Sequence, residues 1–373
     1  MPKETASGER RVALVPDVVG SLSDKGVEVV VESGAGAEAG FPDAAYEEAG
    51  AKTGSAGDAW NADVVLRVAV PTREDIGRLD RGRVLIGHLA PLTSPGTNKA
   101  LADAGVTSFA MEAIPRITRA QAMDALSSQA NLAGYAATLL AAREAGRLFP
   151  MMTTAAGTVP PAKVLVLGAG VAGLQAIATA KRLGAVVTGF DIRRAAWEQI
   201  ASLGGRPLEL DFIPDAEGEG GYARPLTEEE NEKVREALAE NAARQEVIIT
   251  TAQIPGRRAP ILITAEAVRN MAPGSVIIDL AGETGGNTEF TKAGETVDEG
   301  GVRVIAPSNL PSQLAKDASQ LYAKNIENLL ALLVDEEGDL SIDFDDEIVA
   351  GAVITHDGEI RNERAREAKE IQR

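Results

Sequence analysis

The chain contains no cysteine, and only 2 of its 373 residues are histidines. The lack of cysteine rules out disulfides, cysteine-ligated metal sites and thiol chemistry. Its apolar runs fall far short of the ~18 residues that span a bilayer, and no apolar signal-peptide core follows the polar start MPKETASGERR. We therefore expect a cytoplasmic protein with no direct membrane insertion and no metal site.

Basic residues are also too few to balance the acids. The sequence has 37 Lys and Arg against 55 Asp and Glu, which gives a formal net charge of −18. Such a chain repels phosphate backbones and anionic lipid surfaces. We therefore exclude nucleic acid as a partner, although the same acid excess also serves solubility or adaptation to salt.

Short β-branched runs alternate with Ala-rich segments that suit helices. This alternation is typical of parallel α/β units, and a single core stops growing at roughly 250–300 residues. We expect an α/β protein with two Rossmann-like, doubly wound parallel-sheet domains joined by long helices. The strands are expected at 11–15, 27–32, 63–68, 83–88 and 106–112, and at 163–168, 185–191, 246–252, 275–281 and 302–308.

Two long helical segments suggest how the domains connect. Residues 123–149 predict one joining helix, and residues 311–334 predict a second that crosses back, so that a tail with a strand pair within 340–360 returns to the first domain. The expected domains are 1–125 plus 315–373, which form a discontinuous N-terminal domain, and 126–314.

A dinucleotide fingerprint opens the second set of strands. Gly168, Gly170 and Gly173 form G-x-G-x-x-G between a strand and a helix, and Asp191 ends the next strand. The glycines permit a tight turn, close approach of a pyrophosphate and packing of helix on strand. Asp191 would bind the adenosine ribose and select NAD over NADP, although Arg193 and Arg194 could hold a 2′-phosphate. The fingerprint therefore predicts that Gly168, Gly170, Gly173 and Asp191 contact the cofactor.

Groups that could move a proton are scarce. A dehydrogenase acting on an alcohol or amine usually needs His, Lys or a tuned carboxylate near its substrate. His88 ends an expected strand as a structural or surface residue, and His356 lies in a turn expected to be solvated. No Ser-His-Asp grouping or Walker-type loop is present, which disfavours hydrolases and kinases. A hydride passed directly between two nicotinamides needs no proton transfer.

The stretch PRITRAQAMDALSSQ, residues 115–129, places polar groups on an irregular segment that enters a helix. Arg116, Gln121 and Asp124 could orient a nicotinamide ring and its carboxamide through charge and hydrogen bonds alone. The same residues equally allow a polar loop over a helix N-terminus, in which Asp124 or Ser127 serves the backbone.

Several segments together resemble the NAD(H)-binding component, domain I, of proton-translocating nicotinamide nucleotide transhydrogenase. They are PRITRAQAMDALSSQANLAGY, GAGVAGLQAIATAKRLGA, GGYA, TTAQIPGRRAPILIT, GSVIIDLA, GGN and LPSQLAKDASQLYAKN. The resemblance implies that Arg116, Gln121, Asp124 and Ser127 hold the nicotinamide. It also implies that the cofactor is contacted along the turn by Gly168, Ala169, Gly170, Val171, Ala172 and Gly173, and after the next strand by Asp191, Ile192 and Arg193. It implies that Gly221 and Tyr222 begin a mobile loop over the nucleotide, which agrees with a lid expected from the acidic insertion 215–233. Gln253, which stands where the family often has Leu, is expected to contact the nucleotide through a polar side chain.

The resemblance also implies a reaction and an assembly. In such enzymes NAD(H) on this component exchanges hydride with NADP(H) on a separate domain, while a membrane subunit translocates protons. The chain looks like the soluble alpha-1 type of subunit, which is a dimer and sits at the inner face of the cell membrane through its partner subunits.

Two other functions remain open from the sequence. Alanine dehydrogenase shares the fold and binds its substrate with Arg, Lys and His; here Arg11 fits the first, Ala69 replaces the Lys, and His88 fits only with a shift of register. Saccharopine-type dehydrogenases resemble the chain more remotely. A catalytically silent NAD-binding sensor would use the same fingerprint without turnover.

Overall fold

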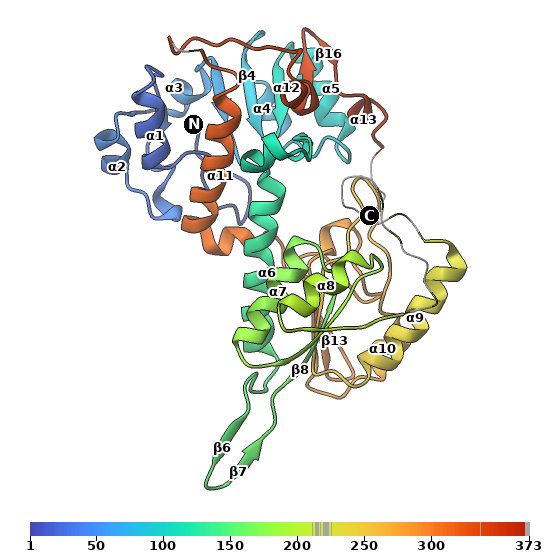
Figure 1. Ribbon diagram of the computed structural model, residues 1–373. Coiled ribbons are helices and arrows are strands. Elements are labelled where there is room, and N and C mark those ends of the chain that lie inside the picture. Colours follow the sequence, from blue (N-terminus) through green and yellow to red (C-terminus); the bar gives the residue numbers. More distant parts are fainter. Residues whose placement is uncertain are drawn as a thin grey trace. The chain divides into compact units, whose positions relative to one another are not determined.

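The computed structural model describes residues 1–210, 212, 216, 218, 224, 226–335 and 337–369. Contacts divide the chain into two compact units (Figure 1). Unit 1 comprises Met1–Gln129 with Pro311–Gln372, and unit 2 comprises Ala130–Leu310. Among the described helices, none combines the length and the apolar composition needed to cross a membrane.

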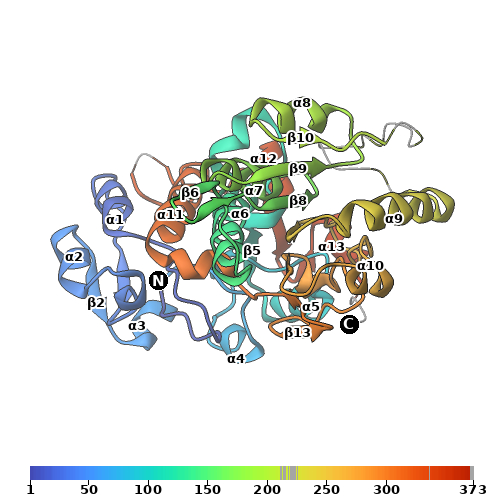
Figure 2. The same ribbon diagram turned by 90° about the horizontal axis from the view of Figure 1, so that it is seen from below.

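Unit 2 is built on a seven-stranded sheet of order β10-β9-β8-β11-β12-β14-β13, of which Figure 2 shows β10, β9 and β8 side by side. All neighbours pair in parallel except β13 with β14. Counted from β8, the parallel strands follow the 3-2-1-4-5-6 order of a doubly wound fold, with its switch point between β8 and β11. The strands are β8 (Lys163–Leu167), β9 (Val186–Phe190), β10 (Arg206–Pro207), β11 (Val247–Thr250), β12 (Val276–Asp279), β13 (Thr296–Glu299) and β14 (Val302–Ile305).

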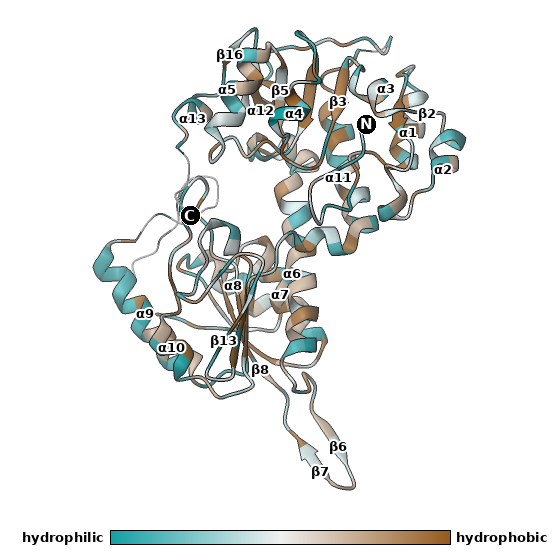
Figure 3. Cartoon of the chain, turned by 180° about the vertical axis from the view of Figure 1, so that it is seen from behind, coloured by the Kyte–Doolittle hydropathy of each residue, from teal (hydrophilic) through white to brown (hydrophobic). Residues whose placement is uncertain are grey.

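Helices cover both faces of this sheet. Val234 of α9 and Val268 of α10 share one buried cluster with side chains of β8, β11 and β12. Helices α7 and α8 cover the opposite face of the sheet. A Cβ added to Gly189 of β9 would lie 2.8 Å from Ile177 of α7 and 3.0 Å from Ile200 of α8. Figure 3 accordingly colours the strands brown and most of α9 teal. The helices are α7 (Val171–Arg182), α8 (Ala195–Ser202), α9 (Glu228–Ala242) and α10 (Ala265–Arg269), with α6 (Ala125–Glu144) entering the unit at residue 130.

Unit 1 contains a five-stranded sheet of order β16-β15-β5-β4-β3 and a separate parallel pair, β1-β2. Strands β3, β4 and β5 pair in parallel, and β15 joins β5 in antiparallel orientation. Strands β15 and β16, from the last part of the chain, thus extend a sheet whose other strands come from the first third. The strands are β1 (Val30–Glu32), β2 (Lys52–Gly54), β3 (Val64–Leu66), β4 (Val84–Gly87), β5 (Thr107–Ala110), β15 (Val353–His356) and β16 (Glu359–Ile360).

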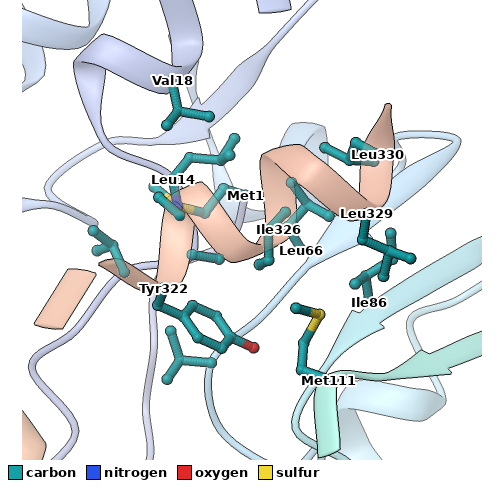
Figure 4. Packing of buried hydrophobic residues seen from close by; sticks show 14 of the residues in the cluster. Met1, Leu14, Val18, Leu66, Ile86, Met111, Tyr322, Ile326, Leu329 and Leu330 are labelled. Carbon is teal, nitrogen blue, oxygen red and sulfur yellow. The ribbon is translucent and has the colours of Figure 1, made fainter. Parts of the chain in front are cut away.

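Helix α11 (Ala315–Leu330) forms the centre of the unit 1 core (Figure 4). Its Tyr322, Ile326 and Leu329 are fully buried among side chains from the first third of the chain. The Tyr322 hydroxyl donates a 2.9 Å hydrogen bond to the carbonyl of Arg67, so the buried phenol has a partner. The other helices of the unit are α1 (Pro16–Ser23), α2 (Asp43–Glu48), α3 (Ala56–Trp60), α4 (Arg73–Ile76), α5 (Pro95–Ala104), α12 (Glu347–Ala352) and α13 (Glu363–Arg366).

The structure differs from the predicted elements in three places. Residues 11–15 form no strand, because this extended segment bonds to side chains: the Val12 N–H donates to the Ser319 hydroxyl. The strand pair predicted within 340–360 is confirmed as β15 and β16, but it is confined to 353–360, and residues 347–352 form a helix that Asp346 caps through the N–H of Ile348. The hairpin of β6 (Met152–Thr154) and β7 (Gly157–Val159) was not predicted.

Arg67 is one of the buried charged residues of unit 1 and provides a test of its packing. Its side chain is 2% exposed, it bonds to Glu4 at 2.7 Å and to Asp75 at 3.3 Å, and it lies 5.2 Å from the Trp60 ring centroid. Arg67→Met leaves a buried carboxylate without its cation, so we expect the free energy of unfolding in urea to fall by about 3–5 kcal/mol.

The matched control is Arg83→Met, which removes an ion pair with the exposed Asp63. Exposed pairs contribute little, so its loss should stay below about 1 kcal/mol. Equal losses in the two variants would contradict the structural role assigned to Arg67.

Candidate functional site

The turn that follows β8 is held by glycines and by Thr251. Gly168 has φ +92°, in the left-handed region that side chains disfavour. A Cβ on Gly173 would lie 1.8 Å from the Gly168 carbonyl oxygen, so α7 approaches β8 this closely only without a side chain there. The Thr251 hydroxyl donates to the same oxygen at 3.1 Å. Three segments therefore fix one turn.

The second glycine of the motif lies beside open space. A Cβ added to Gly170 would meet no heavy atom of the described chain within 4 Å. Gly170 is the N-cap of α7, and the first N–H groups of a helix have no partner within it and form the positive end of its dipole. Ala169 is buried beneath the turn, whereas Val171 and Ala172 begin the helix at its surface. The turn thus fits an anionic group such as a pyrophosphate.

Asp191 lies directly after β9 and is 7% exposed. Its Oδ1 accepts hydrogen bonds from the backbone N–H and the Nε of Arg193, both at 2.9 Å. Its Oδ2 accepts from the Ala169 N–H and from Arg193 Nη2, both at 2.8 Å. The structure therefore brings the predicted acid, the arginine two residues later and the glycine turn into direct contact.

The loops after β11 and β12 complete this edge of the sheet. The exposed Gln253 donates to the Leu280 carbonyl at 3.0 Å. Asn287 is fully buried, accepts from the Ala252 N–H at 3.1 Å and donates to the Ala252 carbonyl at 2.9 Å. Sequence reasoning missed Thr251 and Asn287 as supports of the site. Thr251 could have been found as a polar residue directly after a buried strand, whereas Asn287 lies further along the loop after β12 and gives no such signal.

Three other residues were predicted to belong to this site. Ile192 is partly buried and packs against the hydrophobic cluster beneath α9. Gly221 and Tyr222, predicted to begin a mobile loop, lie outside the described residues.

The predicted nicotinamide loop lies in unit 1. Arg116 and Gln121 are exposed on an irregular segment that includes a 3-10 turn at Thr118–Met123. Asp124 is partly buried, and it accepts from the Ser127 N–H at 2.8 Å and from the Ser127 hydroxyl at 2.6 Å. Asp124 thus serves the first turn of α6, as one of the two interpretations of the sequence had it.

Side chains from the last quarter of the chain hold this loop in place. Asn325 of α11 donates to the Ala122 carbonyl at 2.8 Å and accepts from the Ser128 hydroxyl at 2.7 Å. Arg119 pairs with Asp346, the N-cap of α12, at 2.7 Å, and this hydrogen bond lowers the pKa of Asp346. The loop is therefore positioned by α11 and α12 rather than by its own backbone alone.

Both histidines have partners within unit 1. His88 lies 3.5 Å from Glu112 and stacks 5.1 Å from the Tyr322 ring. Burial raises the pKa of Glu112, but His88 and the Ala90 N–H outweigh burial and hold that pKa below its usual value. His356, expected to be solvated, is instead partly buried, with its Nδ1 3.0 Å from the Thr107 hydroxyl. Across the described residues, no cluster of His, Asp and Glu could hold a metal ion.

Comparison with known proteins covers both units. Residues 1–133 match the family model "Alanine dehydrogenase/PNT, N-terminal domain", and residues 137–363 match "Alanine dehydrogenase/PNT, C-terminal domain". The chain is 49% identical over 370 residues to an NAD(P) transhydrogenase alpha subunit of Rhodospirillum rubrum, covering 96% of each chain.

Two solved structures resemble the whole chain. A transhydrogenase from Sinorhizobium meliloti matches with a TM-score of 0.88 and 47% identity, over 96% of this chain and 98% of that one. An L-alanine dehydrogenase matches with a TM-score of 0.82 and 26% identity, over 98% and 97% of the chains. The chain therefore belongs to the alanine dehydrogenase/PNT family, as a homologue of the NAD(P) transhydrogenase alpha subunits.

Proposed function

We propose that this chain is the NAD(H)-binding subunit of a proton-translocating transhydrogenase. It exchanges hydride between NAD(H) bound here and NADP(H) bound by a partner domain, while a membrane subunit translocates protons. The chain would then work in the cytoplasm, at the inner face of the cell membrane through these partners. The observation that carries the proposal is the glycine turn, where Gly170 borders open space at the start of α7.

The residues present fit a dinucleotide with an unphosphorylated ribose. The N–H groups at the start of α7 would hold the pyrophosphate, and the Asp191 carboxylate would accept from the ribose hydroxyls. Gln253, exposed on the loop after β11, offers a polar contact at the same edge of the sheet. Bound nicotinamide supplies the carbon that gives or takes the hydride.

The loop of unit 1 would orient the nicotinamide without acting as an acid or base. Arg116 and Gln121 are exposed donors that suit a carboxamide, while the Asp124 carboxylate already accepts two hydrogen bonds from Ser127. Hydride exchange between two nicotinamides moves no proton, so a rigid set of donors is sufficient.

Alanine dehydrogenase activity fits the residues less well. The guanidinium of Arg11, which would bind a substrate carboxylate, is held by both carboxylate oxygens of Glu9 at 2.8 and 2.6 Å and donates to Gln129 at 2.9 Å. Ala69 stands where that enzyme needs a Lys. The carboxylate of an amino-acid substrate would have to displace the Glu9 carboxylate from Arg11.

The proposed function is tested by calorimetry with NADH and NADPH, followed by two activity assays. We expect selective binding of NADH, no alanine from pyruvate, ammonium and NADH, and hydride exchange only after a transhydrogenase NADP(H)-binding domain is added. Turnover of pyruvate by the chain alone would favour the amino-acid dehydrogenase. Binding without either reaction would favour a sensor.

A first variant tests the pyrophosphate site. Gly170→Ala places a methyl group into space without described protein atoms, at φ −76°, which any residue adopts. We expect unchanged thermal stability but at least about tenfold weaker NADH binding, because the methyl group overlaps the pyrophosphate. Gly96→Ala is the matched control, since it also adds a Cβ that meets no described atom within 4 Å, yet in α5 of unit 1. Equal NADH affinity in the two variants would refute the assigned position.

A second variant tests the nicotinamide loop. Gln121→Ala should slow hydride exchange about 10- to 100-fold through loss of orientation, while the dissociation constant of NADH changes little. The control is Lys99→Gln on α5 of the same unit, which breaks an exposed ion pair with Asp103 and should leave the rate nearly unchanged. Parallel loss of rate and of NADH affinity would mean that Gln121 contributes to binding rather than to orientation.

We also propose that the chain forms a homodimer through the β6–β7 hairpin. Residues 151–160 are all exposed, including Met151 at 65%, Met152 at 44% and Val159 at 41%. A two-stranded hairpin is marginally stable alone, and a second copy would cover its apolar side chains.

The double variant Met151→Asp, Val159→Asp should sediment as a monomer in analytical ultracentrifugation, because charges would be buried at the interface. The control is Leu321→Asp on α11, where an equally apolar residue is 44% exposed and no partner is proposed. A dimer that persists in the hairpin variant would place the interface elsewhere.

A further inference from the structure

We propose that Arg193 occupies the Asp191 carboxylate in the free protein as an internal substitute for the ribose hydroxyls. NAD(H) binding then requires the guanidinium to leave, and Arg193 sets how sharply the chain distinguishes NAD(H) from NADP(H). The inference rests on the proposed function, since it concerns the carboxylate assigned there to the ribose.

The acceptor positions of Asp191 are already filled. An ionised carboxylate offers about four lone-pair sites. Two are taken by the N–H groups of Ala169 and Arg193, and two by Nε and Nη2 of the Arg193 side chain. A ribose diol needs acceptors in the same places. Either the backbone N–H groups or the Arg193 side chain must therefore leave Asp191 before the ribose can bind.

Only the side-chain donors are able to leave. The Ala169 N–H belongs to the glycine turn, where Gly168 donates to the Phe190 carbonyl at 2.8 Å and Thr251 donates to the Gly168 carbonyl. Moving that donor would disrupt the packing of α7 on β8. The Arg193 guanidinium sits on a flexible stem, and its side chain is 18% exposed, so it can rotate toward solvent.

The contact between Arg193 and Asp191 changes the affinities for NAD(H) and NADP(H) in opposite directions. The fork is bidentate and mostly buried, so it competes with the ribose more strongly than a surface ion pair would. It also neutralises the carboxylate charge that would repel a 2′-phosphate. Once displaced, the guanidinium remains two residues from Asp191 and can itself attract such a phosphate. Arg193 thus lowers affinity for NAD(H) and lessens the rejection of NADP(H).

The experiment measures NADH and NADPH binding to the full chain by calorimetry, with circular dichroism to confirm folding. Arg193→Ala should bind NADH roughly 3- to 10-fold more tightly, by the usual contribution of a hydrogen bond, and NADPH more weakly. Arg193→Lys keeps the positive charge but loses the bidentate guanidinium. It should therefore also strengthen NADH binding and weaken NADPH binding, but by smaller factors than Arg193→Ala. Arg206→Ala is the charge-matched control: it removes an exposed arginine from β10, the strand next to β9, and both affinities should stay near wild type.

Three results would overturn the inference. Weaker binding of both nucleotides by Arg193→Ala would make Arg193 a phosphate anchor, and unchanged affinities would make it inert. An equal gain from Arg206→Ala would reduce the effect to net charge. Each leaves the proposed function intact, whereas a wild-type chain that binds no NADH would remove the proposed function and this inference together.

Discussion

The architecture of unit 2 depends on one close approach, between the Gly168 carbonyl and the backbone of Gly173. Because a Cβ on Gly173 would lie 1.8 Å from that oxygen, the contact exists only with glycine there. It brings the start of α7 against the end of β8, at the switch point of the sheet. The ends of β9 and β11 then supply Asp191 and Thr251 to the same turn. The glycine spacing sets the shape of the turn, and the strand order brings Asp191 and Thr251 to it.

The polar groups of this site are bonded to one another within the protein. Asp191 links the glycine turn to the end of β9, and Asn287 links the loops after β11 and β12. Buried polar atoms are costly without partners, so a site near a sheet edge is stable alone only if its residues satisfy each other. Ligand binding at such a site exchanges internal hydrogen bonds for external ones. The net affinity of the site for its ligand is therefore smaller than the number of protein–ligand contacts would suggest.

The sequence predicted the fold class and the glycine turn because both follow from local patterns. Buried strands are continuous apolar runs, and the fingerprint needs only three glycines and an acid at a fixed spacing. Residues 11–15 looked like such a strand, yet the Val12 N–H bonds to Ser319, which lies far along the chain. The roles of Thr251 and Asn287 likewise depend on contacts between distant segments. The β6–β7 hairpin is exposed throughout, so it leaves no burial pattern to recognise.

The two interpretations of the loop at 116–124 do not exclude each other. Asp124 accepts from Ser127 and so serves the helix start, which is a structural task. That same bond fixes where the loop ends, while Asn325 fixes the Ala122 carbonyl in its middle. A loop that orients a ring without proton transfer depends entirely on such positioning, since misplacement by about 1 Å is enough to cost a hundredfold in rate. The structural contacts of Asp124 and Asn325 are therefore the means by which exposed residues of the loop, such as Gln121, would act in the proposed reaction.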